Sequence, residues 1–544
     1  MKVWVTALLV FIAAIIVYRV TVTSVFSGDD LQYTSVIHQM VNQDFFYHPT
    51  GGQAYIANGE TRPIQTVSIN PRYLLEWPTS ALAGKIGQAI GSQDTLIPAI
   101  QTLRILVGAL GLAVFFLAVY TLTENQVIAI VTSAGLGLSV SYWTYSIHMD
   151  QSINMVCLLC MAFYVFVRQI KSGFNTRGTL LMIILLAFAS FYNFTAAVSA
   201  AAFGVGYVLF QPGFNPVRAL RQLISFGAVY AIIVVGVILG AIAVFVSPSS
   251  VFDPAFWRAA TFGGKPEYFI NPVSDAIRAA IGLGKSQILF PGLYGSVNDF
   301  FETASGSSRI LLAAYYGVVL VVLISPFIFL FLQRRKSGNG SKVAAFLFVW
   351  LLAHSLFNWF WDPGFNKYWL IPLVCCWAAA AIAINLLRTS ANRFYKPVLL
   401  VALAVAIVSF GINLSTQFLP DSKADENEWL QIAYAMKTET QAEDLFLSPA
   451  HEMDFYLTFF ARRDVLSAGL IAYDTNEAVS NLTNIVNERI ETHRADNGQI
   501  YVYGLEDLPE DELAAFRELL ADGELREAWV FPEATIYELV SPTS

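Results

Sequence analysis

The chain has 544 residues, of which 56% are apolar and only 13% are charged, and its mean hydropathy is +0.55. A water-soluble globular protein carries about 25% charged residues, so this composition excludes a wholly soluble protein. The net charge of −8 averages two unlike parts, because residues 420–544 hold 26 Asp and Glu against eight Lys and Arg, while the remainder is basic. We therefore expect an apolar region surrounded by membrane lipids and an acidic, water-exposed C-terminal domain. The averaged charge itself indicates nothing about partners; no nucleic acid partner is expected.

Eleven segments are long and apolar enough to cross a bilayer, which requires roughly 20 residues. The first follows a single lysine and has no small-residue cleavage site, which indicates a retained helix and not a removed signal. The fifth and sixth are short and are separated by little more than Tyr192 and Asn193. The predicted helices lie at 4–22, 97–121, 127–145, 152–168, 178–192, 194–210, 223–246, 308–332, 343–361, 368–388 and 397–417.

The short basic loops predict the orientation of these helices. With the N-terminus in the cytoplasm, the strongly basic loops all fall on the cytoplasmic side, as the positive-inside rule requires. These loops are 168–177, 211–222, 333–342 and 388–396. The prediction is a polytopic helical domain over 1–419, with outer loops 23–96 and 247–307, and an extracytoplasmic domain over 420–544. Short loops and no organellar signal favour a bacterial plasma (inner) membrane, although a protein of the endoplasmic reticulum would show the same features.

The acidic C-terminal region has the pattern of a small α/β domain. Strands are predicted at 444–448 and 499–503, with a terminal strand pair at 528–540. Helices are predicted at 477–493 and 510–521, the second with acidic residues in its first turn. We find no Gly-rich phosphate loop, metal cluster or nucleophile elbow, so this domain is expected to act as a lid, an acceptor platform or an assembly surface.

The four cysteines offer weak evidence of chemistry. Cys157 and Cys160 form a C-x-x-C, a spacing that suits a redox or zinc pair. Both residues lie within an apolar run, as do Cys375 and Cys376. We interpret all four as small apolar side chains that pack in buried helices.

An acidic pair, Asp29 and Asp30, follows the first predicted helix. Adjacent carboxylates at a membrane boundary can serve as a base and as a cation or substrate ligand, because repulsion and partial burial raise the pKa of one of them. The competing interpretation is helix capping, since acidic residues are ordinary at the start of an amphipathic helix such as the one that follows. The sequence alone favours capping.

Two further groups are predicted on the same outer side. His148 and Asp150 occupy the short turn between the third and fourth helices, where Asp150 could also cap a helix. Asp362 and Lys367 lie in the aromatic turn before the tenth helix. An outer lysine goes against the orientation bias of the other cations, and its ammonium would suit a lipid-linked phosphate.

Other ionisable or polar residues are candidates only because they are expected to lie within the membrane or close to its surface. Arg104 lies just inside the outer end of the second helix. The alternative to a functional role is that its side chain only extends to the membrane surface, so that its charged end reaches water. Arg72 and Lys85 lie in the first outer loop. His354 and Asn193 are interpreted as interhelical hydrogen-bonding residues.

The combination of these motifs resembles the GT-C superfamily of polyprenyl-phosphate-sugar-dependent glycosyltransferases, which includes protein O-mannosyltransferases and lipid A aminoarabinose transferases. The resemblance rests on Gly28-Asp29-Asp30, Leu103-Arg104, Asp150 before a helix, and the stretch from Asp362 to Trp369. It extends over roughly residues 1–420. The individual motifs are short, so their combination carries the likeness.

The resemblance implies an inverting transfer of a sugar to a hydroxyl of a lipid, glycan or protein acceptor on the outer face. Asp29 would be the general base, and Asp30 would support it. A divalent cation, Mg or Mn, would be bound by Asp29, Asp30 and Asp150 if one is used. His148, Asp150 and Asp362 would contact substrate, and the donor phosphate would be held by Arg104, Arg72, Lys367 and Lys85.

The sequence departs from the family pattern at two points. Its acidic pair is Asp-Asp where many relatives have Asp-Glu, which leaves open which residue is the base. Tyr192-Asn193-Phe194 stands where some relatives carry a metal-binding histidine.

Two other classes of function remain open. A transporter or flippase of a lipid-linked glycan would show internal repeats and helices broken at the midplane. We find no such repeat, and the candidate acids are predicted at one interface and not at mid-bilayer. A non-enzymatic assembly protein would make the acidic pair a helix cap only.

Overall fold

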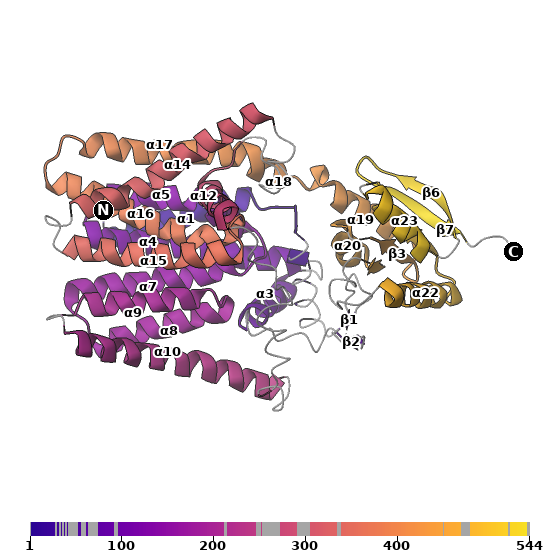
Figure 1. The fold of residues 1–544 in the computed structure, drawn as a ribbon, viewed down its shortest axis with the longest axis horizontal. Coiled ribbons are helices and arrows are strands. Elements are labelled where there is room, and N and C mark those ends of the chain that lie inside the picture. The colour runs from indigo at the N-terminus through magenta and orange to yellow at the C-terminus, as the bar shows by residue number, and fades with distance from the viewer. Residues whose placement is uncertain are drawn as a thin grey trace. The chain divides into compact units, whose positions relative to one another are not determined.

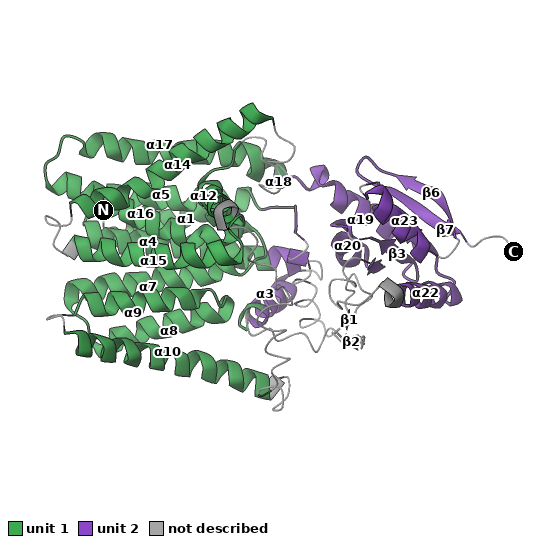
Figure 2. Cartoon of the chain, viewed as in Figure 1, with its two compact units in different colours: residues 1–22, 70–76, 100–420 green, residues 23–69, 77–99, 421–544 purple. Residues whose placement is uncertain are grey.

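The computed structural model describes residues 2–27, 30, 31, 34, 37, 41, 53–55, 61–63, 74–91, 96–211, 215–245, 252, 272–290, 305–333, 339–449, 451–468, 479–506, 508–520 and 523–540. The chain divides into two compact units (Figure 2). Unit 1 comprises residues 1–22, 70–76 and 100–420, and unit 2 comprises 23–69, 77–99 and 421–544. Unit 2 therefore includes most of the outer loop that the sequence prediction assigned to the helical domain.

Unit 1 consists of apolar helices packed side by side (Figure 1). In the described ranges, eight helices are long and apolar enough to cross a membrane, α5 and α6 form a bent pair, and α8 and α9 are shorter apolar helices. Each of the eleven predicted segments thus contains helix, which confirms the polytopic helical fold. The helices are α1 (Val3–Val20), α4 (Leu96–Thr123), α5 (Gln126–Gly137), α6 (Val140–Ile147), α7 (Ser152–Ser172), α8 (Thr176–Tyr192), α9 (Ala196–Leu209), α10 (Pro216–Phe245), α14 (Gly306–Leu332), α15 (Asn339–Trp361), α16 (Leu370–Thr389) and α17 (Tyr395–Asn413).

The predicted third span, 127–145, is a pair of helices whose axes differ by 67°. Its second helix begins anew because Ser139 has an extended backbone and its hydroxyl accepts a hydrogen bond from the Tyr142 amide at 3.4 Å, as an N-cap residue does. The apolar character continues across this break, so hydropathy could not show it. The bend lets Trp143 on α6 stack on Phe418, with ring centroids 4.2 Å apart.

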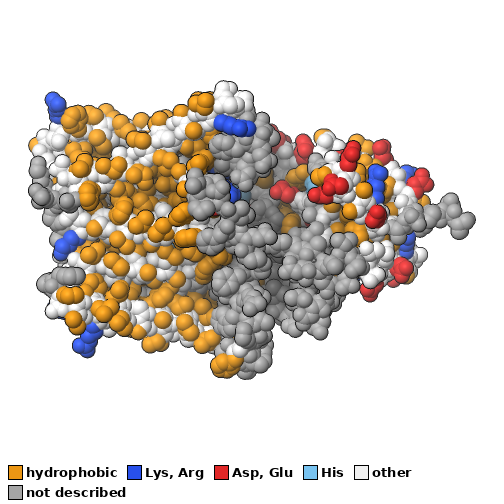
Figure 3. Space-filling view, in the orientation of Figure 1, with side chains coloured by type: hydrophobic (Ala, Val, Ile, Leu, Met, Phe, Trp, Pro, Cys, Tyr) orange, Lys and Arg blue, Asp and Glu red, His pale blue; other side chains and the backbone are white. Residues whose placement is uncertain are grey.

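Helix α16 forms the centre of unit 1, because 83% of the residues in its apolar stretch are buried inside the protein. Helices α10, α14 and α17 instead expose most of their aliphatic side chains, and Figure 3 shows a broad apolar band on the face of the helices in view. Lys and Arg side chains lie at the left end of this face. Apolar outer surfaces are stable when they face lipid hydrocarbon, so unit 1 has the surface of a membrane-embedded bundle.

The described residues before Asn427 include four more short helical elements. The helix α12 carries glycines where it packs on its neighbours. The 3-10 turn η5 leads directly into α16. These elements are α3 (Glu76–Ile90), α12 (Pro272–Gln287), η5 (Asn366–Trp369) and α18 (Leu419–Asp421).

Unit 2 contains a five-stranded mixed sheet with strand order β4-β3-β5-β7-β6. Strand β3 pairs in parallel with β4 and β5, and β7 pairs antiparallel with β5 and β6. Buried aliphatic side chains from β3, β5 and the helices form its core, and a short antiparallel pair, β1 (Gln53–Tyr55) and β2 (Thr61–Pro63), lies apart from this sheet. The strands are β3 (Leu445–Ser448), β4 (Asp464–Ser467), β5 (Ile500–Val502), β6 (Glu524–Val530) and β7 (Thr535–Val540).

The helices of this domain are α19 (Glu428–Glu439), α20 (Met453–Tyr456), α22 (Val479–Ala495) and α23 (Glu510–Leu519). The predicted strands and helices are confirmed here, but β4 and α19 were not predicted. Strand β4 has only four residues, and both Asp464 and Ser467 within it are buried polar residues. A pattern of apolar residues therefore could not reveal it.

Candidate functional site

A buried ion pair links the turn before α7 to the turn before α16. The Lys367 ammonium lies 2.5 Å from the Asp150 carboxylate, and the two side chains are only 6% and 10% exposed. The second oxygen of Asp150 accepts a hydrogen bond from the Ser152 amide at 2.6 Å. Asp150 therefore bonds to a backbone amide at the start of α7, as the capping interpretation predicts, and it is also the counter-ion of Lys367, whereas a contact with substrate stays a prediction.

A second buried ion pair lies beside the first. The Arg104 guanidinium on α4 contacts the carboxylate of Glu76, the first residue of α3, and both side chains are almost completely buried. Arg104 also donates to the Met149 carbonyl from Nη2 at 3.3 Å and from Nε at 3.4 Å. Because Met149 precedes Asp150, this bond connects the two ion pairs through one peptide unit.

Glu76 is the member of this group that sequence reasoning missed. It stands at the start of a helix, where an acidic residue is an ordinary partner of the helix dipole, and the apolar residues on either side of it, Leu75 and Trp77, were the one local sign of burial. In the structure its carboxylate also accepts a hydrogen bond from the Asn154 amide at 3.4 Å. Asn154 lies in the first turn of α7, so Glu76 bonds to residues of both α4 and α7.

The two pairs together place two cations and two carboxylates in an apolar setting. Removing charges from water costs several kcal/mol per ion, and only close, hydrogen-bonded pairing offsets this cost. Among the described residues the charges of the two pairs match, and losing one member of a pair would remove a close counter-charge from the other. Such an arrangement fixes the short turn from His148 to Gln151 in place.

Three neighbouring side chains have polar atoms without a hydrogen-bond partner in the described structure. Gln151 is completely buried, and neither its amide oxygen nor its amide nitrogen is bonded. The Ser152 hydroxyl and the Asn154 amide oxygen are in the same situation. Buried polar groups are nearly always hydrogen-bonded in folded proteins, so this cluster marks a place where water or a polar ligand would bind.

A small polar cavity lies beside Lys367. Its lining includes Ser152, Asn193, His354 and Asn358, and it has room for about one water molecule. His354 on α15 is hydrogen-bonded to Ser199 on α9 at 2.8 Å, which confirms its interpretation as an interhelical hydrogen-bonding residue. Asn193 bonds locally to Thr195 and lies between α8 and α9.

The other predicted residues have varied surroundings. His148 and Asp362 are half-buried in the turns that carry Asp150 and Lys367. Lys85 is exposed on α3, in unit 2. Asp29 and Arg72 lie outside the described residues.

Asp30, in unit 2, takes part in a reciprocal helix cap. Its carboxylate accepts hydrogen bonds from the Ser27 amide at 3.1 Å and from the Ser27 hydroxyl at 3.0 Å. The Ser27 hydroxyl in turn accepts from the Asp30 amide at 3.2 Å. This is the geometry of a capping box, with aspartate in the position that glutamate usually takes.

The described residues do not fit a divalent cation. They contain no group of three or more His, Cys, Asp or Glu side chains that could hold a metal ion. The two carboxylate oxygens of Asp150 already accept from Lys367 and from the Ser152 amide. We therefore derive no step through a metal.

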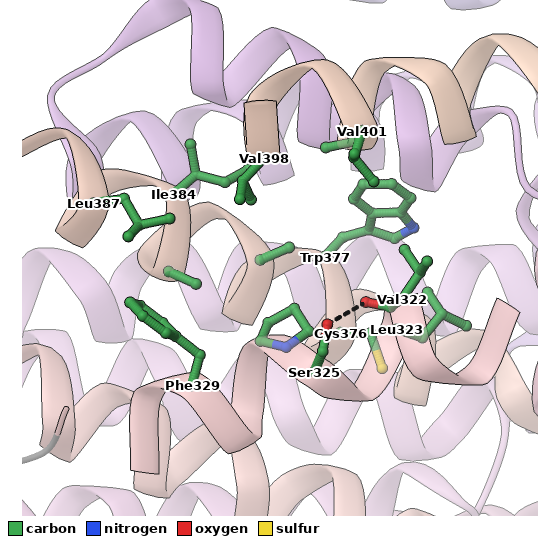
Figure 4. A pocket seen from close by; sticks show the side chains of 14 residues that line it. Val322, Leu323, Ser325, Phe329, Cys376, Trp377, Ile384, Leu387, Val398 and Val401 are labelled. Carbon is green, nitrogen blue, oxygen red and sulfur yellow. Dashed lines mark hydrogen bonds between the residues drawn. The ribbon is translucent and has the colours of Figure 1, made fainter. Parts of the chain in front are cut away.

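A groove of about 280 Å³ between α14, α16 and α17 contributes nothing to this site (Figure 4). Its lining is apolar apart from Ser325, whose hydroxyl donates to the carbonyl of Val322 within the same helix. The groove therefore offers no acid, base or cation for chemistry. Among the described residues of unit 1, the buried Asp, Glu, Lys and Arg side chains are those of the two ion pairs.

Unit 1 is thus a polytopic helical bundle with charged side chains buried at one end, and the chain also carries a C-terminal α/β domain. No known family model and no curated protein matches the sequence. Solved structures do share the fold. ArnT from Cupriavidus metallidurans, bound to undecaprenyl phosphate, matches over 99% of both chains with a TM-score of 0.59 and 12% identity.

Two further structures agree with this result. ArnT from the same organism in the apo state has a TM-score of 0.56 at 12% identity, again over 99% of both chains. An Archaeoglobus fulgidus oligosaccharyltransferase in complex with Zn and sulfate has a TM-score of 0.55 at 12% identity, over 97% of this chain and 73% of its own. The predicted GT-C resemblance is thus confirmed at the level of the fold.

Proposed function

We propose that this protein is a membrane glycosyltransferase that moves a sugar from a polyprenyl-phosphate carrier to an acceptor hydroxyl. The observation that supports this most is the pair of linked, buried ion pairs, Glu76–Arg104 and Asp150–Lys367, at one end of a GT-C bundle. An active site that separates a sugar from a phosphate needs fixed cations and carboxylates in a water-poor setting, where electrostatic interactions are strong. The binding of undecaprenyl phosphate to the ArnT neighbour agrees with a lipid-linked donor.

The proposed reaction is a single inverting displacement. The acceptor oxygen attacks the anomeric carbon, its proton passes to the Asp29 carboxylate, and the bond from that carbon to the phosphate oxygen breaks. The polyprenyl phosphate leaves with the bonding electrons. Asp30, as a cap of the helix that follows, would support Asp29 by position.

Lys367 would stabilise the departing phosphate, while Asp150 holds the ammonium in place. Lysine serves as a point charge for phosphate groups. Arg104 is completely buried and bonded to the Met149 carbonyl, so it would position the Asp150 turn. Phosphate contacts by Arg104, Arg72 and Lys85 stay predictions, as do substrate contacts by His148 and Asp362.

The reaction would take place at the outer face of a bacterial inner membrane, with the N-terminus in the cytoplasm. The acceptor would be a lipid, a glycan or a protein. The support for this orientation is the placement of the basic loops on the cytoplasmic side by the positive-inside rule.

A transfer assay tests the proposal directly. Purified protein is given radiolabelled undecaprenyl-phosphate sugars together with a membrane extract as the acceptor source, and wild type is compared with Asp29→Asn and Lys367→Gln. We expect wild type to transfer label and both variants to lose at least 100-fold, within the range of ~10²–10⁴ that a general base contributes. Transfer by Asp29→Asn at the wild-type rate would remove the proposed base, and labelled lipid that crosses vesicle membranes without transfer would favour a flippase.

A further inference from the structure

A groove with both polar and apolar walls lies between α8, α9 and α10, at one end of unit 1 (Figure 1). Its volume is about 550 Å³. The site described above does not use it. We propose that this groove binds an anionic glycerophospholipid of the surrounding bilayer, with the phosphate at Arg218 and Arg221 and an acyl chain between α8 and α10.

The polarity of the lining changes along both helices in the same direction. On α10 the lining passes from Arg218 and Arg221 to Phe226 and Val229, and on α8 it passes from Thr176 to Ile183. Both helices begin at this end, so the polar residues form one end of the groove and the apolar residues the other. At a rise of about 1.5 Å per residue, the α10 wall extends about 16 Å, which matches a lipid headgroup followed by the first part of its chain.

The charge of the region favours an anion. The sequence from Gln151 to Phe252 contains no Asp or Glu but has five Lys and Arg residues. Within this stretch, Lys171 is paired with Glu124 at 2.5 Å. Arg218 and Arg221 are exposed, and the groove lining includes no carboxylate among the described residues.

The polar end also has hydrogen-bond donors suited to a phosphate or glycerol group. The Gln211 side chain lines the groove, and its amide nitrogen is buried without a partner in the described structure. Asn175, Thr179 and Gln222 lie beside it in the lining. Basic pockets between membrane helices are known to bind anionic headgroups at the cytoplasmic side, which is the side that the basic loops predict for this end.

The groove is far from the proposed reaction site. Helix α7 begins beside Asp150 and ends at Ser172, three residues before Asn175, and its 21 residues span about 31 Å. That distance is about the thickness of the bilayer hydrocarbon. An anion bound at Arg218 is therefore not the phosphate that reacts near Lys367, which favours a structural phospholipid over the sugar donor.

The test uses the full-length protein, purified in mild detergent and stripped of lipid. Phosphatidylglycerol, phosphatidylcholine and undecaprenyl phosphate are added separately, and lipid retained per protein is measured by native mass spectrometry, with the melting temperature as a second readout. The test variant is Arg218→Gln/Arg221→Gln. The matched control is Arg168→Gln/Arg177→Gln, which removes two exposed cations from the same end without touching the groove lining.

We expect phosphatidylglycerol, but not phosphatidylcholine, to be retained and to raise the melting temperature of wild type. The groove variant should bind phosphatidylglycerol about 30-fold more weakly, since each cation near a lipid surface contributes roughly a fivefold change in affinity, and the control should bind as wild type does. A filling substitution, Thr179→Trp, should also reduce binding, whereas Leu181→Trp on the exposed face of α8 should not.

Three results would overturn the proposal. Equal binding of phosphatidylglycerol by the groove variant and wild type would exclude the site. Equal retention of phosphatidylcholine would exclude recognition of the charge. Binding of undecaprenyl phosphate alone, lost in the groove variant, would assign the groove to the donor lipid. None of these results depends on transferase activity, so the lipid-binding proposal is tested independently of the proposed function.

Discussion

Asp150 and Lys367 are separated by 217 positions in the sequence, yet their charged groups lie 2.5 Å apart inside the protein. Each residue belongs to a short turn that precedes a long apolar helix, α7 for Asp150 and α16 for Lys367. The pair therefore holds the starts of two helices together at the end of the bundle where Arg104 and Glu76 also meet.

Breaking this pair should show how much the loss of a counter-charge lowers the stability of the protein. Lys367→Met leaves the Asp150 carboxylate buried without its cation, and we expect a loss of about 3–5 kcal/mol in stability. The double variant Lys367→Met/Asp150→Asn strands no charge and should recover part of that loss. Thermal unfolding of the four proteins in a double-mutant cycle measures the coupling. If the two single effects simply add, the residues are not coupled as the geometry indicates.

Glu76→Gln tests the second ion pair. The substitution keeps the shape of the side chain but removes the Glu76 charge from beside the buried Arg104 guanidinium, so we expect a loss of about 3–5 kcal/mol. Glu124→Gln is the matched control, because the pair of Glu124 with Lys171 is solvent-exposed and exposed pairs contribute little. Melting temperatures of the purified variants give the comparison. A small effect of Glu76→Gln, similar to that of Glu124→Gln, would show that the Glu76–Arg104 pair is not a structural element.

Asp30 and Ser27 offer a test that separates capping from catalysis. If Asp30 acts only in the capping box, Asp30→Asn and Ser27→Ala should lower stability by similar amounts, each about 0.5–2 kcal/mol. Both variants should then keep most of their transfer activity. A large loss of transfer confined to Asp30→Asn, with stability equal to that of Ser27→Ala, would give Asp30 a direct role in the reaction.

Gly282 on α12 packs against the turn that carries Lys367. A Cβ atom at this position would collide with the Pro363 carbonyl and the Trp369 indole nitrogen. We expect Gly282→Ala to displace this turn and to cost about 1–3 kcal/mol, as overpacking does. Gly317→Ala is the control, because a Cβ there meets nothing within 4 Å. Melting temperature and transfer rate should both fall for Gly282→Ala only; equal behaviour of the two variants would argue against a fixed turn.

The C-terminal domain should lose stability as the pH rises above neutral. Burial acts to lower the pKa of His493, but its hydrogen bonds to the Asp464 carboxylate and the Glu443 carbonyl outweigh this and raise the pKa above its ordinary value of 6.5. The folded state thus binds the proton more tightly than the unfolded chain. The resulting stabilisation is complete below pH 6.5 and is lost as the pH rises through the folded pKa.

Hydrogen exchange of α22 in the full-length protein, followed between pH 5.5 and 9 and corrected for intrinsic exchange rates, measures this effect. Wild type should show opening that increases with pH over this window. His493→Gln should remove the dependence, because glutamine does not titrate. A variant with the same pH profile as wild type would assign the effect to another group.

The predicted and observed features of the site differ in a consistent way. Asp150 and Lys367 were identified as candidates because each lies in an outer turn between apolar helices, and depth along the membrane can be read from hydropathy. Their mutual contact could not be predicted, because it depends on how α7 and α16 pack. Glu76 was overlooked for the same reason, since its burial depends on Arg104 and Asn154, which lie on other helices.

The sequence by itself determined the class of this protein, the positions of its eleven apolar segments and the acidic α/β domain. These are local properties, because an apolar side chain favours lipid or a core whatever its neighbours are. Only the tertiary structure decided the bend at Ser139, the fourth strand, the helix cap formed by Asp30 and the pairing of four buried charges. Those features depend on contacts between residues far apart in the chain, and the free energy of a buried charge is set by its partner rather than by its position in the sequence.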